Sequence, residues 1–301
     1  MVASTWWTRA FAGMMIACLP GAASIGAQST ESDTTVSTGG GEGGLCTPVP
    51  GAPRLNGIAY SVRSDADDQL YRFDPATGLA VAVGPVGFAD VECLAFSESG
   101  ELFGVDDVTD TLITIDIATG AGTAVGPLGV TFTDCGLSFD DSGGLFMSVD
   151  SPSPLNLYSV DPVTGAAVAI GPQGQRVTGL TYAGGTLYGL GGDGTNNLLD
   201  VDRATGAATE IGAFTGVSPD DGGIDFDGNG VLWGIEDGGC VFVLDAATGA
   251  ATPAATTFSG FESLAILRPQ LIQAVPGLSQ RGIAALAALL AAAAFLMLRR
   301  R

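Results

Sequence analysis

Hydrophobic and polar residues alternate in short runs from Gly57 onward, and this pattern recurs five times along the chain. Alternation with a period of two predicts β-strands rather than helices. The most regular run in each repeat ends in Asp-x-x-Thr-Gly, and these segments are spaced by 41 to 45 residues. A period of this length is typical of propellers and solenoids. The five aspartates that mark the repeat are Asp74, Asp116, Asp161, Asp202 and Asp245.

Each repeat contains four predicted strands, which is the number in one blade of a propeller. The first repeat begins at its second strand, residues 58–62, and the strand that it lacks appears at the other end, residues 263–266. A closed ring explains this split because the last strand completes the first blade and removes exposed edges. The predicted fold is therefore all-β: a five-bladed β-propeller over residues 54–268, closed by a one-plus-three strand clasp.

The Asp-x-x-Thr-Gly segments are predicted to be hairpin turns. Asp accepts local backbone N–H groups at the start of a turn, and Gly takes the left-handed conformation that closes it. A uniform ligand site is the alternative. Five identical turns would lie on one face of the ring, while longer and unequal loops lie on the other, where function is expected.

The two ends differ in composition from the repeats. Residues 1–27 contain Arg9, an apolar stretch and small residues before Ala27, the order of a secretory signal peptide. A lipoprotein signal that uses Cys18 is the alternative. Residues 28–53, rich in Ser, Thr, Gly and Glu, are predicted to be a flexible linker.

Residues 269–301 form a predicted anchor tail. Residues 282–298 are almost entirely apolar and residues 299–301 are arginines, which predicts a transmembrane-type helix with its arginines in the cytoplasm. The alternative is a buried terminal helix, but soluble helices normally have one polar face. The ends together predict an exported protein of the cell surface or extracellular space, held at the inner membrane by this tail, transiently or permanently.

Val275-Pro276-Gly277-Leu278-Ser279, the apolar run and the terminal arginines resemble the IPTL-CTERM and PEP-CTERM class of sorting tails. That resemblance implies a membrane-embedded, exosortase-type transpeptidase as a partner. Gly277 departs from the usual Thr, and Gln280-Arg281 from an acidic residue and Trp. The repeats also resemble uncharacterised secreted β-propeller domains with Asp-Pro-Ala-Thr-Gly hairpins, as at residues 74–78, which implies a fold and no activity.

Charge and composition limit the partners and the kinds of catalysis that are possible for this chain. The chain has 32 acidic and 11 basic residues, no His and a formal net charge of −21, which disfavours nucleic acid as a partner. Without His, Ser-His-Asp and Cys-His catalysis and His-type zinc sites are excluded. No catalytic residue is predicted. The favoured function is a non-enzymatic binding or structural module of the cell envelope or matrix, and the alternative is a calcium-dependent hydrolase or lyase.

Two acidic groups are candidate metal sites. Four carboxylates precede the innermost strands and are expected to ring the mouth of the central channel, where Ca²⁺, or a cationic or polyhydroxylated ligand, would bind: Glu92, Asp134, Asp221 and Glu262. The alternative is a solvated acidic surface. A second candidate resembles an EF-hand loop, with Asp225, Asp227 and Asn229 as ligands, but its repeat position predicts a hairpin turn.

Four cysteines lie outside the signal sequence: Cys46, Cys93, Cys135 and Cys240. An even number in an exported protein favours disulfides. Cys93 and Cys135 occupy nearly equivalent inner-strand positions, and Cys46 reaches Cys240 if the linker folds back over the fifth blade. Free buried thiols are the alternative, and the connectivity stays open at this point.

Overall fold

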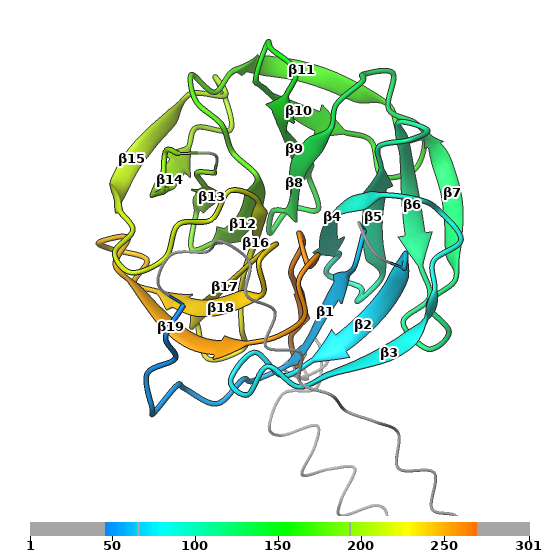
Figure 1. The fold of residues 1–301 in the computed structure, drawn as a ribbon. Helices are drawn as coiled ribbons and strands as arrows, with labels where there is room; N and C mark the ends of the chain where they lie inside the picture. The colour runs from blue at the N-terminus through cyan, green and yellow to red at the C-terminus, as the bar shows by residue number, and fades with distance from the viewer. Residues whose placement is uncertain (1–45, 65–66, 193, 270–301) are drawn as a thin grey trace, which may run out of the picture. The chain divides into compact units, whose positions relative to one another are not determined.

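The chain forms a five-bladed β-propeller (Figure 1), as the repeat predicts. The computed structural model describes residues 46–64, 67–192 and 194–269. Within them, every element is a β-strand, and the strands form five four-stranded sheets placed around a common centre. No helix long and apolar enough to cross a membrane occurs among the described residues. The signal sequence predicted at 1–27 and the helix predicted at 282–298 lie outside them.

Each blade is an antiparallel sheet. In blades 2 to 5 the strands run in sequence order from the centre outward, whereas the innermost strand of blade 1 is the last strand of the chain's described part. Blade 1 has the order β20 (Ala265–Leu267), β1 (Ile58–Val62), β2 (Gln69–Phe73), β3 (Ala80–Pro85). Blade 2 contains β4 (Val91–Phe96), β5 (Leu102–Asp106), β6 (Thr111–Ile115) and β7 (Gly122–Pro127). Blade 3 contains β8 (Asp134–Phe139), β9 (Leu145–Ser151), β10 (Asn156–Val160) and β11 (Ala167–Pro172). Blade 4 contains β12 (Gly179–Ala183), β13 (Thr186–Leu190), β14 (Asn197–Val201) and β15 (Ala208–Ala213). Blade 5 contains β16 (Gly222–Phe226), β17 (Leu232–Glu236), β18 (Cys240–Leu244) and β19 (Ala251–Thr256).

Blade 1 combines strands from both ends of the repeat region. β20 pairs antiparallel with β1, with Tyr60 opposite Ala265. The chain that precedes β1 lies on blade 5 instead: Cys46 is bonded to Cys240, and the Val49 N–H donates to the Pro253 carbonyl at 2.9 Å. Residues 46 and 49, which lie within the segment 28–53 predicted to be a flexible linker, are therefore held against blade 5.

The Asp-x-x-Thr-Gly segments are hairpin turns, as predicted. The Asp116 carboxylate accepts the Ala118 N–H at 2.7 Å, and Gly120 has a φ of 84°. This glycine is required for a second reason, because a Cβ there would lie 2.3 Å from the Gly84 carbonyl oxygen of the neighbouring blade. The same approach joins Gly165 to Gly126, Gly206 to Gly171 and Gly249 to Gly212. The repeated glycines thus hold the outer edges of adjacent blades together.

The hydrophobic core lies between adjacent blades rather than in the middle of the ring. Trp233, Phe242 and Phe261, among the largest of the buried side chains, are 0% exposed. Near the axis small residues replace large ones: a Cβ on Gly136 would lie 2.6 Å from the Gly179 carbonyl carbon, and one on Gly223 would lie 2.2 Å from the Leu264 nitrogen. The inner strands therefore meet backbone to backbone.

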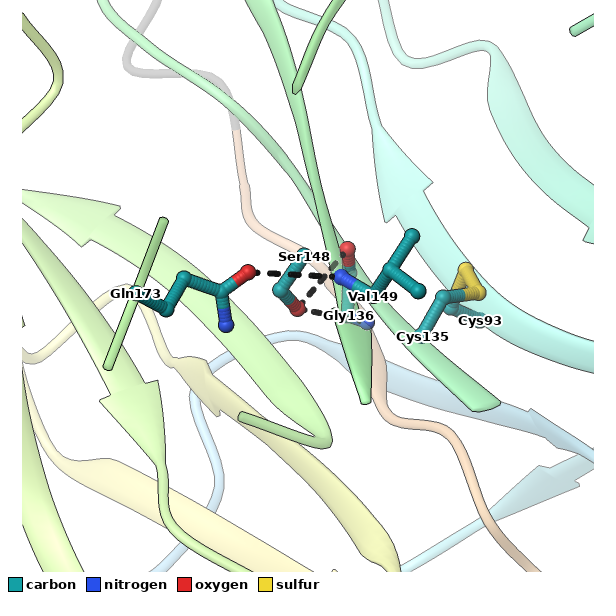
Figure 2. Close-up of a disulfide and its surroundings, with 6 residues drawn as sticks. All are labelled: Cys93, Cys135, Gly136, Ser148, Val149 and Gln173. Carbon is teal, nitrogen blue, oxygen red and sulfur yellow. Dashed lines mark hydrogen bonds between the residues drawn. A yellow bond between two sulfur atoms is a disulfide. The ribbon is translucent and has the colours of Figure 1, made fainter. Parts of the chain in front are cut away.

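The centre of the propeller is consequently closed. The space enclosed by the inner strands has a cavity volume of about 10 Å³, which is at most room for one water molecule. Figure 2 shows the wall of this centre, where Cys93 of β4 is bonded to Cys135 of β8. Beside that bond the Ser148 hydroxyl accepts the Gly136 N–H at 2.8 Å, and the Gln173 side chain accepts the Val149 N–H at 3.4 Å. The two ends of the inner strands are therefore separate from one another.

Candidate metal centre

Acidic side chains gather at the end of the ring where the inner strands begin. Glu92 lies in β4, Asp134 is the first residue of β8, and Asp221 directly precedes β16. One carboxylate oxygen from each lies within 4.8 Å of the other two. The structure thus brings together three of the four carboxylates that the sequence places at the channel mouth.

A bulge in the pairing of β4 with β5 sets the direction of Glu92. The register shifts between Val91 and Cys93, so Glu92 has no partner across the sheet. In blade 3 the extra residue is on the other strand: Asp134 pairs with Ser151, Cys135 pairs with Val149, and Asp150 of β9 has no partner across the sheet. Bulges of this kind re-aim side chains next to functional sites.

Glu262, the fourth predicted residue, lies near the group and acts on it through its charge. It is 7% exposed, and one of its oxygens accepts a hydrogen bond from the Ser64 hydroxyl. Its negative charge contributes to the raised pKa values of both Glu92 and Asp221. At the corresponding place in blade 4, the Thr178 hydroxyl donates to the Leu190 carbonyl at 3.5 Å.

The electrostatics of this opening oppose full ionisation. Burial is the largest cause that raises the pKa of Glu92, followed by the charges of Glu262 and Asp221. Burial also raises the pKa of Asp221 well above its usual range, with Asp134 the next cause. Buried like charges disfavour the charged form of each other. Either protons or a cation must therefore neutralise the group at neutral pH.

Glu92 is the most constrained member. It is 5% exposed, and among the described residues no backbone N–H, hydroxyl or guanidinium donates a hydrogen bond to it. Its close polar neighbours are other carboxyl groups, Asp90 among them. A buried carboxylate normally requires donors or a positive charge. A cation would satisfy Glu92 and all its neighbours at once.

A second group of carboxylates adjoins the first. Asp90, Glu92 and Asp107 also have ligand atoms within 4.8 Å of one another. Asp107 follows β5 directly, and burial followed by the charge of Asp90 raises its pKa to about 7. Asp107 is not among the four carboxylates predicted at the channel mouth, although its position directly after β5 places it on the acidic face.

The predicted EF-hand-like residues lie at the other end of β16 and are occupied by other contacts. Asp225 pairs with Arg268 at 2.7 Å and accepts the Thr181 hydroxyl at 2.8 Å. Asp227 accepts the Asn229 N–H at 2.8 Å within a hairpin turn. Neither aspartate belongs to the two close carboxylate groups found among the described residues. A calcium ion at this turn stays a prediction.

The opposite opening of the ring is a pocket of about 400 Å³. Phe96, Phe139 and Tyr182 line it together with the Asp225–Arg268 ion pair. Phe96 packs edge-on against Tyr60 of blade 1. The aromatic residues thus fill the wedges between blades as well as lining the pocket.

No protein-family model and no curated protein sequence matches the chain. Several solved structures are similar to the chain. One is a protein of unknown function from Bacteroides thetaiotaomicron, with 18% identity and a TM-score of 0.46 over 60% of this chain and 54% of that one. The chain thus spans about half the length of that structure.

Two further matches are gluconolactonases. A putative gluconolactonase has 14% identity and a TM-score of 0.46 over 73% of this chain and 82% of that one. A gluconolactonase from Xanthomonas campestris has 16% identity and a TM-score of 0.44 over 67% of this chain and 78% of that one. The fold and the site together define a β-propeller with a group of close carboxylates at one end of its inner strands.

Proposed function

We propose that this chain is an exported β-propeller that binds a calcium ion at its acidic opening and acts as a non-enzymatic binding module of the cell surface or extracellular matrix. The observation that carries the proposal is the convergence of Glu92, Asp134 and Asp221 within 4.8 Å. Oxygen ligands lie 2.3–2.6 Å from calcium, so two ligand atoms on opposite sides of one ion are separated by roughly 5 Å. The three carboxylates therefore fit calcium with little movement.

Calcium is a better fit than magnesium or zinc. Magnesium requires oxygens at about 2.0–2.1 Å, which would draw the carboxylates closer together, and it sheds its water reluctantly. Zinc sites in proteins normally include Cys or His beside any carboxylate, and the chain contains no His while its four described cysteines form two disulfides. Carboxylates alone are the donor set of a hard cation. When bound, the ion would neutralise the buried charge and hold the loops of blades 2, 3 and 5 together.

The disulfides support export. Cys46–Cys240 and Cys93–Cys135 are both formed, and structural disulfides persist in oxidising compartments outside the cytoplasm. This agrees with the secretory signal proposed at residues 1–27. We further propose that the tail at 269–301 anchors the chain in the inner membrane until an exosortase-type transpeptidase removes it. The apolar run at residues 282–298 and the arginines at 299–301 support this proposal. It is tested by mass spectrometry of the exported chain, which should lose the mass of the tail only in cells that contain the transpeptidase.

The pairing of β20 with β1 is proposed to act as the clasp that keeps the ring closed. Three residue pairs join the two strands, Ile58 with Leu267, Ala59 with Ile266 and Tyr60 with Ala265. Without β20, the inner edge of β1 would present unpaired backbone groups. The clasp also positions Glu262, which lies three residues before β20.

Calorimetric titration of the metal-free full chain with Ca²⁺ tests the proposal. We expect heat of binding in the parent and its loss in Glu92→Gln and Asp221→Asn, because each removes a negative ligand. Asp161→Asn is the control, since Asp161 lies in a hairpin turn on the opposite face and its carboxylate is held by local hydrogen bonds. Absence of binding heat in the parent would refute the proposal.

A calcium-dependent hydrolase or lyase is the second candidate, favoured by the same convergence of carboxylates. A calcium ion held by Glu92, Asp134 and Asp221 would polarise a carbonyl oxygen of a substrate at the opening. Incubation of the calcium-loaded chain with lactone and ester substrates separates the two functions. If the parent turns over a substrate and Glu92→Gln does not, the chain is a calcium-dependent enzyme and the proposal of a non-enzymatic binding module is refuted.

A further inference from the structure

Glu92 belongs to both carboxylate groups at the acidic opening. It has a ligand atom within 4.8 Å of ligand atoms of Asp134 and Asp221 in the first group, and of Asp90 and Asp107 in the second. A glutamate side chain has two oxygens, each able to bind a different cation. We infer that the opening is a two-cation site in which Glu92 bridges two calcium ions, the second held by Asp90 and Asp107. This inference rests on the proposed binding of the first ion.

The charge of the site favours two ions over one. Five carboxylates, those of Asp90, Glu92, Asp107, Asp134 and Asp221, form the two groups. A single divalent cation would leave three negative charges in a partly buried place, whereas two leave one. Repulsion between charges a few ångströms apart is costly wherever water is partly excluded. The second ion therefore removes most of the repulsion that the first would leave.

Hydrogen bonds hold the second group in place before any ion binds. The Asp107 N–H donates to the Asp90 carbonyl at 3.2 Å, and the Asp90 N–H donates to the Asp68 carboxylate at 3.2 Å. Asp90 has a φ of 64°, a left-handed conformation that few residues other than Gly, Asn and Asp adopt readily. The loop before β4 is thus held on both sides of Asp90, and preorganised ligands bind a metal more tightly.

A buried oxygen atom in the second group supports a ligand beyond the first ion. Oδ1 of Asp107 is inaccessible to solvent and has no hydrogen-bond partner among the described residues. Glu92, which belongs to both groups, is 5% exposed, and its side-chain hydrogen-bond partner is another carboxyl group, that of Asp90. Buried polar atoms without a partner are rare in native proteins. Coordination by a cation accounts for the Asp107 oxygen and for the close approach of Glu92 to Asp90.

Metal content measured after equilibrium dialysis tests the inference. The full chain is stripped with EGTA, dialysed against Ca²⁺, and analysed for bound calcium by atomic emission. We expect two calcium ions per chain in the parent and one in Asp107→Asn and in Asp90→Asn. Asn tolerates the left-handed conformation, so Asp90→Asn keeps the loop geometry. Far-UV circular dichroism in EGTA verifies that each variant is folded.

The control is Asp110→Asn, in the same loop as Asp107 but outside both groups, which is expected to retain two ions. Glu92→Gln is expected to lower the affinity for both ions, because it removes the charge that they share. One ion in the parent, lost in Asp134→Asn and unaffected by Asp107→Asn, would overturn the two-cation site and leave the proposed function intact. No bound calcium in the parent would overturn both.

Discussion

The Cys46–Cys240 disulfide is predicted to be the largest single covalent contribution to stability. It joins residues 194 positions apart and so encloses most of the repeat region. The entropy of closing such a loop in the unfolded chain corresponds to about 5 kcal/mol at 25 °C, against about 4 kcal/mol for the 42-residue separation of Cys93 and Cys135. For a domain of this size, a loss of about 5 kcal/mol lowers Tm by roughly 10–20 °C.

The double variant Cys46→Ala/Cys240→Ala is compared with the parent by urea and thermal unfolding, monitored through the fluorescence of buried Trp233. Val163→Ala serves as the control because that side chain is 80% exposed. The fold should remain, since the Val49–Pro253 hydrogen bond and the β20–β1 pairing are unchanged. A Tm within 2 °C of the control variant would refute the reasoning.

Three further predictions concern the closed ring and its acidic opening. Gly223→Ala should lower the unfolding free energy by about 1–3 kcal/mol, measured by urea unfolding, because its Cβ would lie 2.2 Å from the Leu264 nitrogen. Truncation before β20 should give dimers or aggregates in size-exclusion chromatography, since it leaves β1 as an exposed edge. In EGTA, stability should fall from pH 5 to pH 8, because the pKa values of Asp107 and Glu236 are raised to about 7 and the folded state loses its advantage as these groups ionise. Saturating Ca²⁺ should reverse that trend, and a pH-independent Tm in EGTA would contradict it.

Sequence periodicity was sufficient for the blades because every strand and hairpin has a local signal. The Asp-x-x-Thr-Gly turns and the alternating strands are recognisable from neighbouring residues alone. The closure of the centre was not predictable in this way: Gly136, Gly179 and Gly223 lie on three different blades, and only the fold brings their backbones into contact. A repeat pattern therefore predicts a channel without predicting its width.

The candidate site was also predictable in part from the repeat, while the rest depends on contacts between residues that are far apart in the sequence. Glu92, Asp134 and Asp221 follow a shared position before the inner strands, and their grouping could be predicted from the repeat. Asp107 reaches the site through the loop after β5, and Asp237 occupies the equivalent place after β17 in blade 5. The N–H of Asp107 donates to the Asp90 carbonyl as the N–H of Asp237 donates to the Asp221 carbonyl. The repeat therefore marks this position, but only the fold shows that the Asp107 carboxylate joins Glu92. The bulge at Glu92, which directs its carboxylate between the two groups, depends on the register of β4 against β5.

The closed centre has a consequence for any function. Because about 10 Å³ remains between the inner strands, no substrate can pass from the acidic opening to the pocket beside Phe139 and Tyr182. A ligand of the acidic opening is therefore bound from one face only, where the carboxylates and any cation are within reach. The opposite pocket has a different lining, which includes the Asp225–Arg268 pair and aromatic side chains. Substitutions of the clustered carboxylates should leave binding at that pocket unchanged, because none of those residues lines it.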